Sequence, residues 1–390
     1  MKLMEFINIG TFGHVDHGKS TLTTALTGVR TDRHSEEIKR GITIRLGHAE
    51  FIIYEKDGKY YNTPVDGAKP IKGISIVDAP GHESLLAVAV SGIALLDGAI
   101  FVIAANEPCP QPQTREHLYM LNYLGMKNIV IVQTKVDTVS KEQALKNYQE
   151  IKEFVKGTVA ENAPIIPISS TYKLNLEYLL EELVKIPQRS RSFRVNDLAL
   201  AVRSFDVNRP GTDVQNMHGG VIGGAVLDGV FRVGDTIEIS PGRYIEKLQN
   251  YKPIITKITS IHRENESLEV ADRNSGLVAF GTTLDPSITR EDLLAGNIIS
   301  KPGQLSQPTR EIKAKIDLIP RHDINNPPLI IGENIIINSL SISTQAIVKN
   351  ISKKVVTIVL KKPITPIDDN FAIFRKLQNR WRFAGMGKII

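Results

Sequence analysis

Residues 13–20 read GHVDHGKS, and the spacing of glycine, lysine and serine in this segment suits the binding of a phosphate chain. An apolar run precedes the segment and a helical pattern follows it, which is the context that a G-x-x-x-x-G-K-[ST] motif requires. The glycines let backbone N–H groups point at phosphate oxygens, and the next helix adds its positive end. We therefore expect a nucleoside triphosphate here, with these binding residues: Gly13, Asp16, His17, Gly18, Lys19, Ser20 and Thr21.

Two side chains of this motif have separate tasks in phosphoryl transfer, which depends on positioning and charge neutralisation more than on covalent chemistry. Lys19 supplies a positive charge to the outer phosphates, and the Ser20 hydroxyl is placed to ligate magnesium. These roles predict a triphosphate with its metal ion. They do not select the base.

A second segment, DAPGH at residues 78–82, follows the apolar run ISIV. Asp78, at the end of a predicted strand, can hold the metal ion through a water molecule. The N–H of Gly81 can meet the γ-phosphate, and His82 would then orient the attacking water. The alternative for His82 is a histidine that makes only structural hydrogen bonds. The Gly-rich loop upstream favours the catalytic role.

A third segment, RGITI at residues 40–44, lies in a polar loop after the first predicted helix. Thr43 could reach the metal ion when a γ-phosphate is present. The alternative is a threonine that only favours an extended backbone. We expect the loops at 33–45 and 79–92 to change order when the γ-phosphate leaves.

The segment IVQTKVD at residues 131–137 resembles the base-recognition loop of a GTPase with one residue changed. The Asp137 carboxylate would accept from two N–H groups of guanine, which adenine cannot offer. Beside Lys135, position 134 holds threonine where such loops carry asparagine. Since one neutral hydrogen bond contributes about 0.5–1.5 kcal/mol, Thr134 predicts weaker binding with the guanine preference intact.

A later apolar run ends in ISS at residues 168–170. We expect Ser169, Ser170 and Thr171 to close over the carbonyl of the base with backbone N–H groups. This segment is recognisable only because the other three loops are present.

These loops need a parallel sheet to bring them together. Residues 1 to about 190 alternate apolar strands with helical stretches, which indicates βαβ units on a parallel sheet covered on both faces. Short β-branched runs broken by glycine and proline follow, as is typical of β-barrels. We predict an α/β P-loop GTPase domain over residues 1–192, followed by two β-barrel domains over 193–302 and 303–390, separated near SKPGQLSQPT.

Composition favours a cytoplasmic protein of more than one domain. The chain has 390 residues, and its lone cysteine, Cys109, excludes an intramolecular disulfide and a multi-cysteine metal site. Residues 85–105 are apolar and long enough to cross a membrane. Because Asp97 would be costly in lipid and Asp97-Gly98 is a turn signal, we predict a buried helix and a strand there, without membrane association.

The net charge of +6 is unevenly distributed. Residues 306–390 hold 14 Lys and Arg against 6 Asp and Glu. This excess predicts either a polyanionic or acidic partner for the C-terminal part or simply a solvated basic surface. Both interpretations stay open at this stage.

Several segments of the chain resemble the gamma subunits of archaeal and eukaryotic translation initiation factor 2, a family related to the elongation factors that carry aminoacyl-tRNA. The resemblance covers nearly the whole chain and includes segments without obvious nucleotide chemistry. The segments are 34–50, 78–87, 104–117, 160–169, 203–212, 219–224 and 379–387.

The resemblance implies a GTPase that binds GTP and GDP and forms the core of a heterotrimer with alpha and beta subunits. In its GTP state such a complex carries initiator methionyl-tRNA to the small ribosomal subunit. The resemblance places the tRNA acceptor end near residues 276–282 and suggests that the basic C-terminal barrel suits the tRNA backbone.

The resemblance also implies residue roles around the metal ion. Asp16, Ser20, Thr43 and the Gly41 carbonyl would lie near magnesium, some of them through water. Val15 and Ile42 would form an apolar gate around the water beside His82; ordinary packed aliphatic side chains are the alternative.

The chain departs from the family pattern in two places. Residues 54–72 lack the four cysteines of the zinc knuckle that many members carry, so we expect no zinc. Thr134 is also found in factors that deliver selenocysteinyl-tRNA, which leaves a specialised elongation factor as one alternative. A second alternative is a GTP-binding scaffold subunit that does not need hydrolysis, although His82 and Thr43 argue against it.

Overall fold

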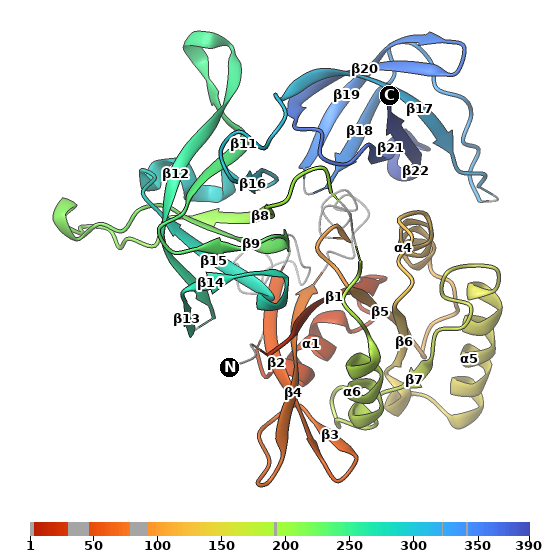
Figure 1. Cartoon of the computed structure of the whole chain (residues 1–390). Coiled ribbons are helices and arrows are strands. Elements are labelled where there is room, and N and C mark those ends of the chain that lie inside the picture. Colours follow the sequence, from red (N-terminus) through yellow and green to blue (C-terminus); the bar gives the residue numbers. More distant parts are fainter. Residues whose placement is uncertain are drawn as a thin grey trace. The chain divides into compact units, whose positions relative to one another are not determined.

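The structure is a computed structural model that describes residues 4–29, 47–78, 93–190, 193–264, 266–321, 323–340 and 342–390. The chain divides into two compact units (Figure 1). The first unit is Met1–Ser190 with Trp381–Phe383, and the second is Arg191–Arg380 with Ala384–Ile390.

A seven-stranded sheet in the order β3-β2-β4-β1-β5-β6-β7 forms the centre of the first unit. The strands from β4 to β7 in this order run parallel, and β2 and β3 form an antiparallel edge. Every residue of β1, which reads FINIGTFG, is buried, as expected of a strand covered on both faces. The bounds are β1 Phe6–Gly13, β2 Gly47–Lys56, β3 Lys59–Tyr61, β4 Lys69–Asp78, β5 Gly98–Ala104, β6 Ile129–Thr134 and β7 Ile165–Pro167.

Helices cover both faces of this sheet. Leu22 of α1 and Leu179 of α6 join one hydrophobic cluster with Ile7 and other strand residues, so these two helices share a face. On the opposite face, α4 packs on β1 through an edge contact between the rings of His117 and Phe12, with 5.7 Å between centroids. The described helices of this unit are α1 Lys19–Thr27, α4 Pro112–Tyr123, α5 Lys141–Val155, α6 Leu176–Lys185 and the 3₁₀ turn η2 Val136–Thr138.

Asp97 lies directly before β5, and its buried carboxylate accepts hydrogen bonds from the backbone. Its two carboxylate oxygens accept hydrogen bonds from the backbone N–H of Asn8 and of Arg189, each at 2.9 Å. The predicted strand after Asp97 is present, whereas the predicted helix before it lies mostly outside the described residues. Among the described residues, no helix combines the length and apolarity needed to cross a membrane.

The first barrel of the second unit is a closed ring of antiparallel strands in the order β11-β16-β8-β9-β15-β12, completed by pairing of β11 with β12. Phe231 and Phe280 pack in its core with ring centroids 5.8 Å apart. The bounds are β8 Leu198–Phe205, β9 Val221–Asp228, β10 Phe231–Arg232, β11 Thr236–Ile245, β12 Asn250–Arg263, β13 Glu266–Leu268, β14 Val270–Ala271, β15 Leu277–Thr282, β16 Ile298–Ser300 and α7 Pro286–Thr289.

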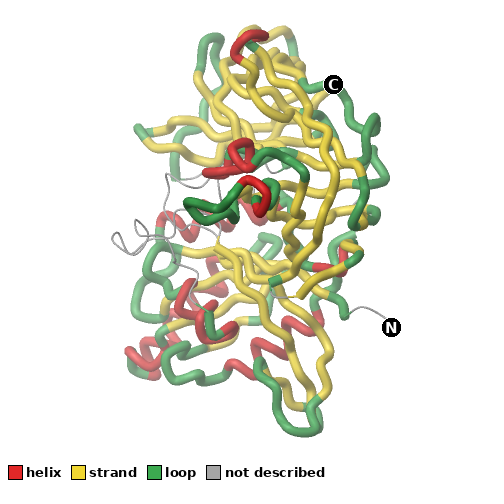
Figure 2. The backbone as a smooth tube through the Cα atoms, turned by 90° about the vertical axis from the view of Figure 1, so that its left-hand side faces the viewer, coloured by secondary structure: helices red, strands yellow, loops and turns green. Residues whose placement is uncertain are grey.

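The second barrel closes in the order β17-β20-β19-β18-β21-β22 through pairing of β17 with β22. Burial alternates along β19 from Ile342 to Lys349, so Ile342, Ala346 and Val348 point inward, whereas Ile347 is exposed. Figure 2 shows strands as the main elements of both barrels. The bounds are β17 Thr309–Leu318, β18 Asn334–Ser339, β19 Ile342–Ser352, β20 Val355–Ile364, β21 Asn370–Leu377 and β22 Arg380–Ile389.

The predicted fold class is therefore confirmed: a mostly parallel α/β domain is followed by two β-barrels. β16 ends at Ser300 and β17 begins at Thr309, on either side of the predicted proline- and glycine-rich connection. The domain boundaries at 192/193 and 302/303 stay predictions.

Candidate nucleotide site

The segments predicted to bind a nucleotide follow the carboxyl ends of neighbouring parallel strands. Residues 13–20 follow β1, Asp78 ends β4, Thr134 ends β6, and residues 168–171 follow β7. The carboxyl ends of parallel strands lie at one edge of the sheet, where ligands of open α/β folds bind. The sheet thus brings together segments that are up to about 150 residues apart in the chain (Figure 1).

The backbone of the phosphate loop is sharply turned. Asp16 and Gly18 have φ of 61° and 87°, in the left-handed region. Gly13 has φ of 144°, and a Cβ there would lie 2.2 Å from the carbonyl oxygen of Val102. Only glycine at position 13 lets β1 approach β5 this closely.

Lys19 lies under this loop as the first residue of α1. Its side chain is 7% exposed, and its Nζ donates to the carbonyl oxygens of Gly13 at 3.1 Å and His14 at 2.7 Å. Burial lowers the pKa of Lys19 to about 8, although nearby Asp78 opposes this shift. The protein therefore holds a poorly solvated cation beside the turned loop, where a phosphate chain could replace the two carbonyls as its partner.

The Asp78 carboxylate is fully buried beside the start of α1. One of its oxygens accepts from the Thr11 hydroxyl at 2.6 Å, and the other accepts from the Ser20 hydroxyl at 2.8 Å. Since Thr11 lies opposite Asp78 in the pairing of β1 with β4, strand register positions this carboxylate. The structure thus brings together two of the oxygen donors predicted to surround magnesium.

The donor chemistry of this pair fits magnesium, which prefers oxygen ligands and keeps several water molecules. A buried carboxylate next to a serine hydroxyl supplies two oxygen ligands of this kind. Within the residues that the structure describes, no group of three or more His, Cys, Asp or Glu side chains is arranged to hold a metal ion. A magnesium ion held by only two protein oxygens, with water and phosphate as its other ligands, would not require such a group.

Helix α4 supports the phosphate loop through two side chains that sequence analysis did not single out. The Nδ1 of His117 accepts from the Gly13 N–H at 2.8 Å, and the Gln113 amide oxygen accepts from the Val15 N–H at 3.1 Å. These side chains are four residues apart, so they lie on one face of the helix. The available signal was PQTREH at residues 112–117, which has this spacing but no obvious nucleotide chemistry.

Burial keeps the histidines around the loop neutral. It lowers the pKa of His117 to about 3 and that of His17 to about 4. The Nδ1 of His17 lies 3.2 Å from the Val102 carbonyl oxygen, and its Nε2 lies 3.4 Å from a carboxylate oxygen of Glu107. The imidazole of His17 is buried on the protein side of the loop. If His17 contacts the nucleotide as predicted, it does so through its backbone.

On the base side, Thr134 connects its own loop to the phosphate loop. Its hydroxyl donates to the His17 carbonyl oxygen at 2.6 Å, and the carbonyl oxygen of Ile103 lies 3.4 Å away. The side chain is 2% exposed. The Thr134 hydroxyl thus connects the loop after β6 to the phosphate loop.

The remaining base-side residues range from buried to exposed. Lys135 has φ of 58° and directly precedes η2, in which Asp137 is exposed. Ser169 is buried and forms a tight turn in which its carbonyl accepts from the Leu174 N–H at 3.0 Å. Ser170 is half-buried and Thr171 exposed. These segments are adjacent because the Ile168 N–H donates to the Gln133 carbonyl at 2.8 Å.

Five predicted site residues lie outside the described part of the chain. They are Gly41, Ile42, Thr43, Gly81 and His82. Of the other predicted residues, Val15 is half-buried in the phosphate loop, and Asp16 and Thr21 are exposed there.

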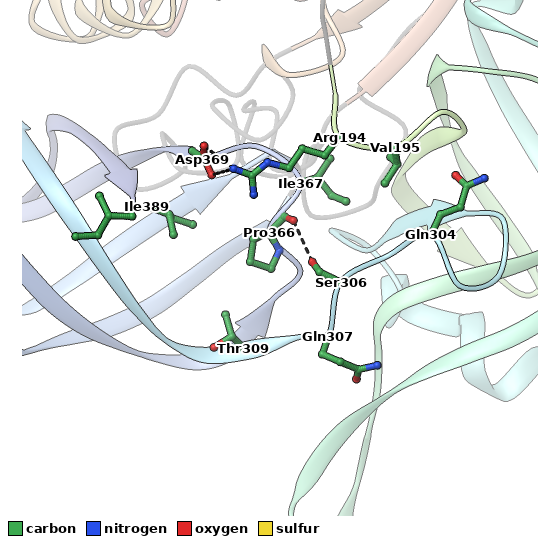
Figure 3. Close-up of a pocket in the computed structure, with 11 residues that line it drawn as sticks. Arg194, Val195, Gln304, Ser306, Gln307, Thr309, Pro366, Ile367, Asp369 and Ile389 are labelled. Atoms are coloured by element: carbon green, nitrogen blue, oxygen red, sulfur yellow. Dashed lines mark hydrogen bonds and ion pairs between the residues drawn. The ribbon is translucent and has the colours of Figure 1, made fainter.

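A separate pocket of about 570 Å³ lies in the second unit. Arg194 and Asp369 point toward each other across it and form a two-bond ion pair at 2.6 and 2.7 Å (Figure 3). The Ser306 hydroxyl donates to the Pro366 carbonyl at 3.1 Å. These contacts pair four of the polar groups that line the pocket.

Two family models match the chain. The model for the elongation factor Tu GTP binding domain matches residues 4–189, and the model for the C-terminal part of initiation factor eIF2 gamma matches residues 316–389. The chain is thus similar to translational GTPases in the part that carries the nucleotide site and to eIF2 gamma in the last barrel.

Similarity to curated proteins extends over almost the whole chain. Translation initiation factor 2 subunit gamma from Methanocaldococcus jannaschii is 45% identical, with 98% of this chain and 97% of the relative covered. The protein of the same name from Aeropyrum pernix is also 45% identical, with the same coverage.

Solved structures confirm the fold. A bacterial selenocysteine-specific elongation factor superposes with a TM-score of 0.75 at 24% identity, covering 99% of this chain and 58% of that protein. Elongation factor SelB from Methanococcus maripaludis, in complex with a GTP analogue, gives a TM-score of 0.72 at 23% identity, covering 100% of this chain and 80% of that one. At such low identity the likeness concerns the fold, whereas the full-length match at 45% shows that this chain, a translational GTPase, belongs to the family of translation initiation factor 2 gamma subunits.

Proposed function

We propose that this chain is the GTP-switched subunit that carries methionylated initiator tRNA to the small ribosomal subunit, within a heterotrimer with alpha and beta subunits. The supporting observation is the 45% identity to translation initiation factor 2 gamma subunits over 98% of the chain, including both barrels. In the proposed layout, the GTP-binding domain spans residues 1–192 and the barrels span 193–302 and 303–390. The proposed location is cytoplasmic.

The nucleotide chemistry follows from the site. Lys19 would exchange its two carbonyl partners for phosphate oxygens, and the backbone of the phosphate loop would orient the chain. Ser20 and Asp78 would hold magnesium, with Asp16, Thr43 and the Gly41 carbonyl nearby. When bound, magnesium neutralises charge on the phosphates and stabilises the transition state of hydrolysis.

Base recognition and water activation complete the proposed site. Asp137 would accept from the N–H groups of guanine, while residues 169–171 close over the base carbonyl. His82 would orient the attacking water, with Val15 and Ile42 as its apolar gate. Comparing ribosome-stimulated GTP hydrolysis between the parent and His82→Ala tests this role, and equal rates would reject it.

The proposed tRNA contacts involve the barrels. The acceptor end would lie near residues 276–282, most of which form β15, and the basic second barrel would suit the tRNA backbone. Since phosphate contacts release counterions, binding that uses this barrel should weaken as salt rises.

The experiment that tests the proposal compares filter binding of initiator and elongator methionyl-tRNA, each in GTP and in GDP. We expect tight binding of initiator tRNA in GTP and weak binding in GDP. A preference for elongator tRNA would reject the initiation role. It would favour the elongation-factor alternative, for which Thr134 is the specific observation.

A further inference from the structure

The contacts of Thr134 point toward the phosphate loop. The Thr134 hydroxyl carries one proton, and its nearest acceptor is the His17 carbonyl oxygen at 2.6 Å. The second neighbour, the Ile103 carbonyl oxygen at 3.4 Å, is also a backbone acceptor. The single donor of this side chain is therefore committed to the protein backbone.

Burial places this hydroxyl away from the surface that a base would reach. Thr134 is 2% exposed, whereas Asp137, three residues later, is exposed. Contact with the Thr134 hydroxyl would require breaking its short bond to His17.

Threonine and asparagine differ here in the number of donors. An asparagine amide has two N–H donors, so it can brace one loop and still donate to a second group. A threonine hydroxyl that braces the loop has no proton left. Guanine carries two acceptors, N7 and O6, on the edge away from the groups that a carboxylate recognises.

We propose that Thr134 is a positioning residue that braces the phosphate loop and gives N7 of guanine no hydrogen-bond donor from position 134. The inference rests on guanine nucleotides binding at this site. It assigns to the protein a tolerance for guanine nucleotides altered at N7. The hydroxyl acts through the His17 carbonyl. The contribution of Thr134 to nucleotide affinity should therefore be the same whether or not the base carries an acceptor at N7.

The first test measures equilibrium binding of GDP and 7-deaza-GDP, which lacks the N7 acceptor, to the full chain. We expect the two dissociation constants to agree within about 2-fold. The Thr134→Asn variant should bind GDP about 2- to 10-fold more tightly than 7-deaza-GDP, since it regains one neutral donor. A parent that binds 7-deaza-GDP 5-fold or more weakly would overturn the inference, as would equal constants in Thr134→Asn.

The second test separates bracing from base contact. Thr134→Val keeps the shape of the side chain and removes the hydroxyl. We expect about 2- to 10-fold weaker binding of both GDP and 7-deaza-GDP, by the same factor, and recovery of both affinities in Thr134→Ser. Losses that differ between the two nucleotides, or no recovery with serine, would contradict the assigned role.

Thr289→Val is the matched control. Thr289 is also a buried threonine whose hydroxyl contacts two carbonyl oxygens, those of Phe205 and Pro286 at 3.1 and 3.0 Å, but it belongs to the second unit. Its loss should lower the melting temperature and leave nucleotide affinity unchanged. An equal loss of affinity in this control would show that Thr134→Val acts only through general destabilisation.

The outcomes distinguish this inference from the proposed function. If GDP itself fails to bind the parent, the proposed nucleotide site is wrong. If GDP binds and 7-deaza-GDP does not, the site stands and only the inference about N7 is wrong. If Thr134→Val fails to fold, the first test still applies. The ratio of the dissociation constants for GDP and 7-deaza-GDP, measured in the parent and in Thr134→Asn, then decides whether the inference about N7 holds.

Discussion

The phosphate side and the base side of the nucleotide site are built differently. On the phosphate side, Lys19 and Asp78 are 7% and 0% exposed and already bonded to protein groups. On the base side, Asp137 and Thr171 are exposed. Groups that must act on a highly charged ligand are more effective when they are held in place and shielded from water. The difference suggests that the phosphate side supplies most of the affinity and the base side supplies the selectivity.

Removing Lys19 tests the phosphate side most directly. Lys19→Ala deletes charge-assisted hydrogen bonds to phosphate oxygens, each worth about 1.5–3 kcal/mol, so we expect roughly 1,000-fold weaker binding of GTP and of GDP. The preference for GTP over ATP should remain for the residual binding. Isothermal titration would measure both, with the exposed Lys146 of α5 replaced by alanine as the control. A loss of affinity below 10-fold would contradict the view that the phosphate side supplies most of the binding affinity.

Replacing Asp137 tests the base side. Asp137→Asn places amide donors against the N–H groups of guanine, and we expect affinity for GTP to fall on the order of 100-fold. Xanthine carries a carbonyl in place of the amino group, so XTP should bind the variant more tightly than GTP does. Competition binding gives the ratio. An equal decrease for both nucleotides would mean that Asp137 supports the loop and does not contact the base.

Removing the support from α4 should weaken the phosphate loop without touching the ligand. His117→Leu leaves the buried Gly13 N–H without its acceptor, which costs up to about 3 kcal/mol of unfolding free energy. Urea unfolding of the nucleotide-free chain at pH 7 measures this loss. His117→Asn can restore an acceptor and should recover part of the stability; if it does not, the hydrogen bond to Gly13 is not the cause.

The same histidine predicts a pH dependence. Burial lowers the pKa of His117 to about 3 in the folded protein, whereas an unfolded histidine titrates near 6.5, so the unfolded state binds more protons between these values. Its contribution to stability is fully present above about pH 6.5 and is lost as pH falls. Between pH 7 and pH 5 the parent should lose about 2 kcal/mol more unfolding free energy than His117→Asn does. If another group causes the dependence, the unfolding free energies of the two proteins will fall by the same amount between pH 7 and pH 5.

Much of the fold was predictable because local patterns and global topology agree. The apolar run expected before the phosphate-binding segment forms β1, Phe6–Gly13. The helical pattern expected after residues 13–20 is α1, which begins at Lys19. Short motifs with one geometric solution, such as a glycine-rich turn between a strand and a helix, can be recognised without knowing what lies next to them.

The supporting residues were not predictable in this way. His117 and Gln113 lie in a segment whose residues have no nucleotide chemistry of their own, and their role depends on α4 packing against β1. Thr134 was expected to bind more weakly than asparagine because it has fewer donors. The structure adds where its one donor goes.

The sequence by itself determined the class of ligand, the parallel sheet and the two barrels, since residue type and spacing along the chain are sufficient for phosphate-binding turns and for strand periodicity. Only the tertiary structure decided which groups brace those turns. Gly13 meets His117 across 104 positions of the chain, and His17 meets Thr134 across 117. Such contacts depend on strand order and helix packing, which are set by burial of the whole domain and leave no local pattern in the chain.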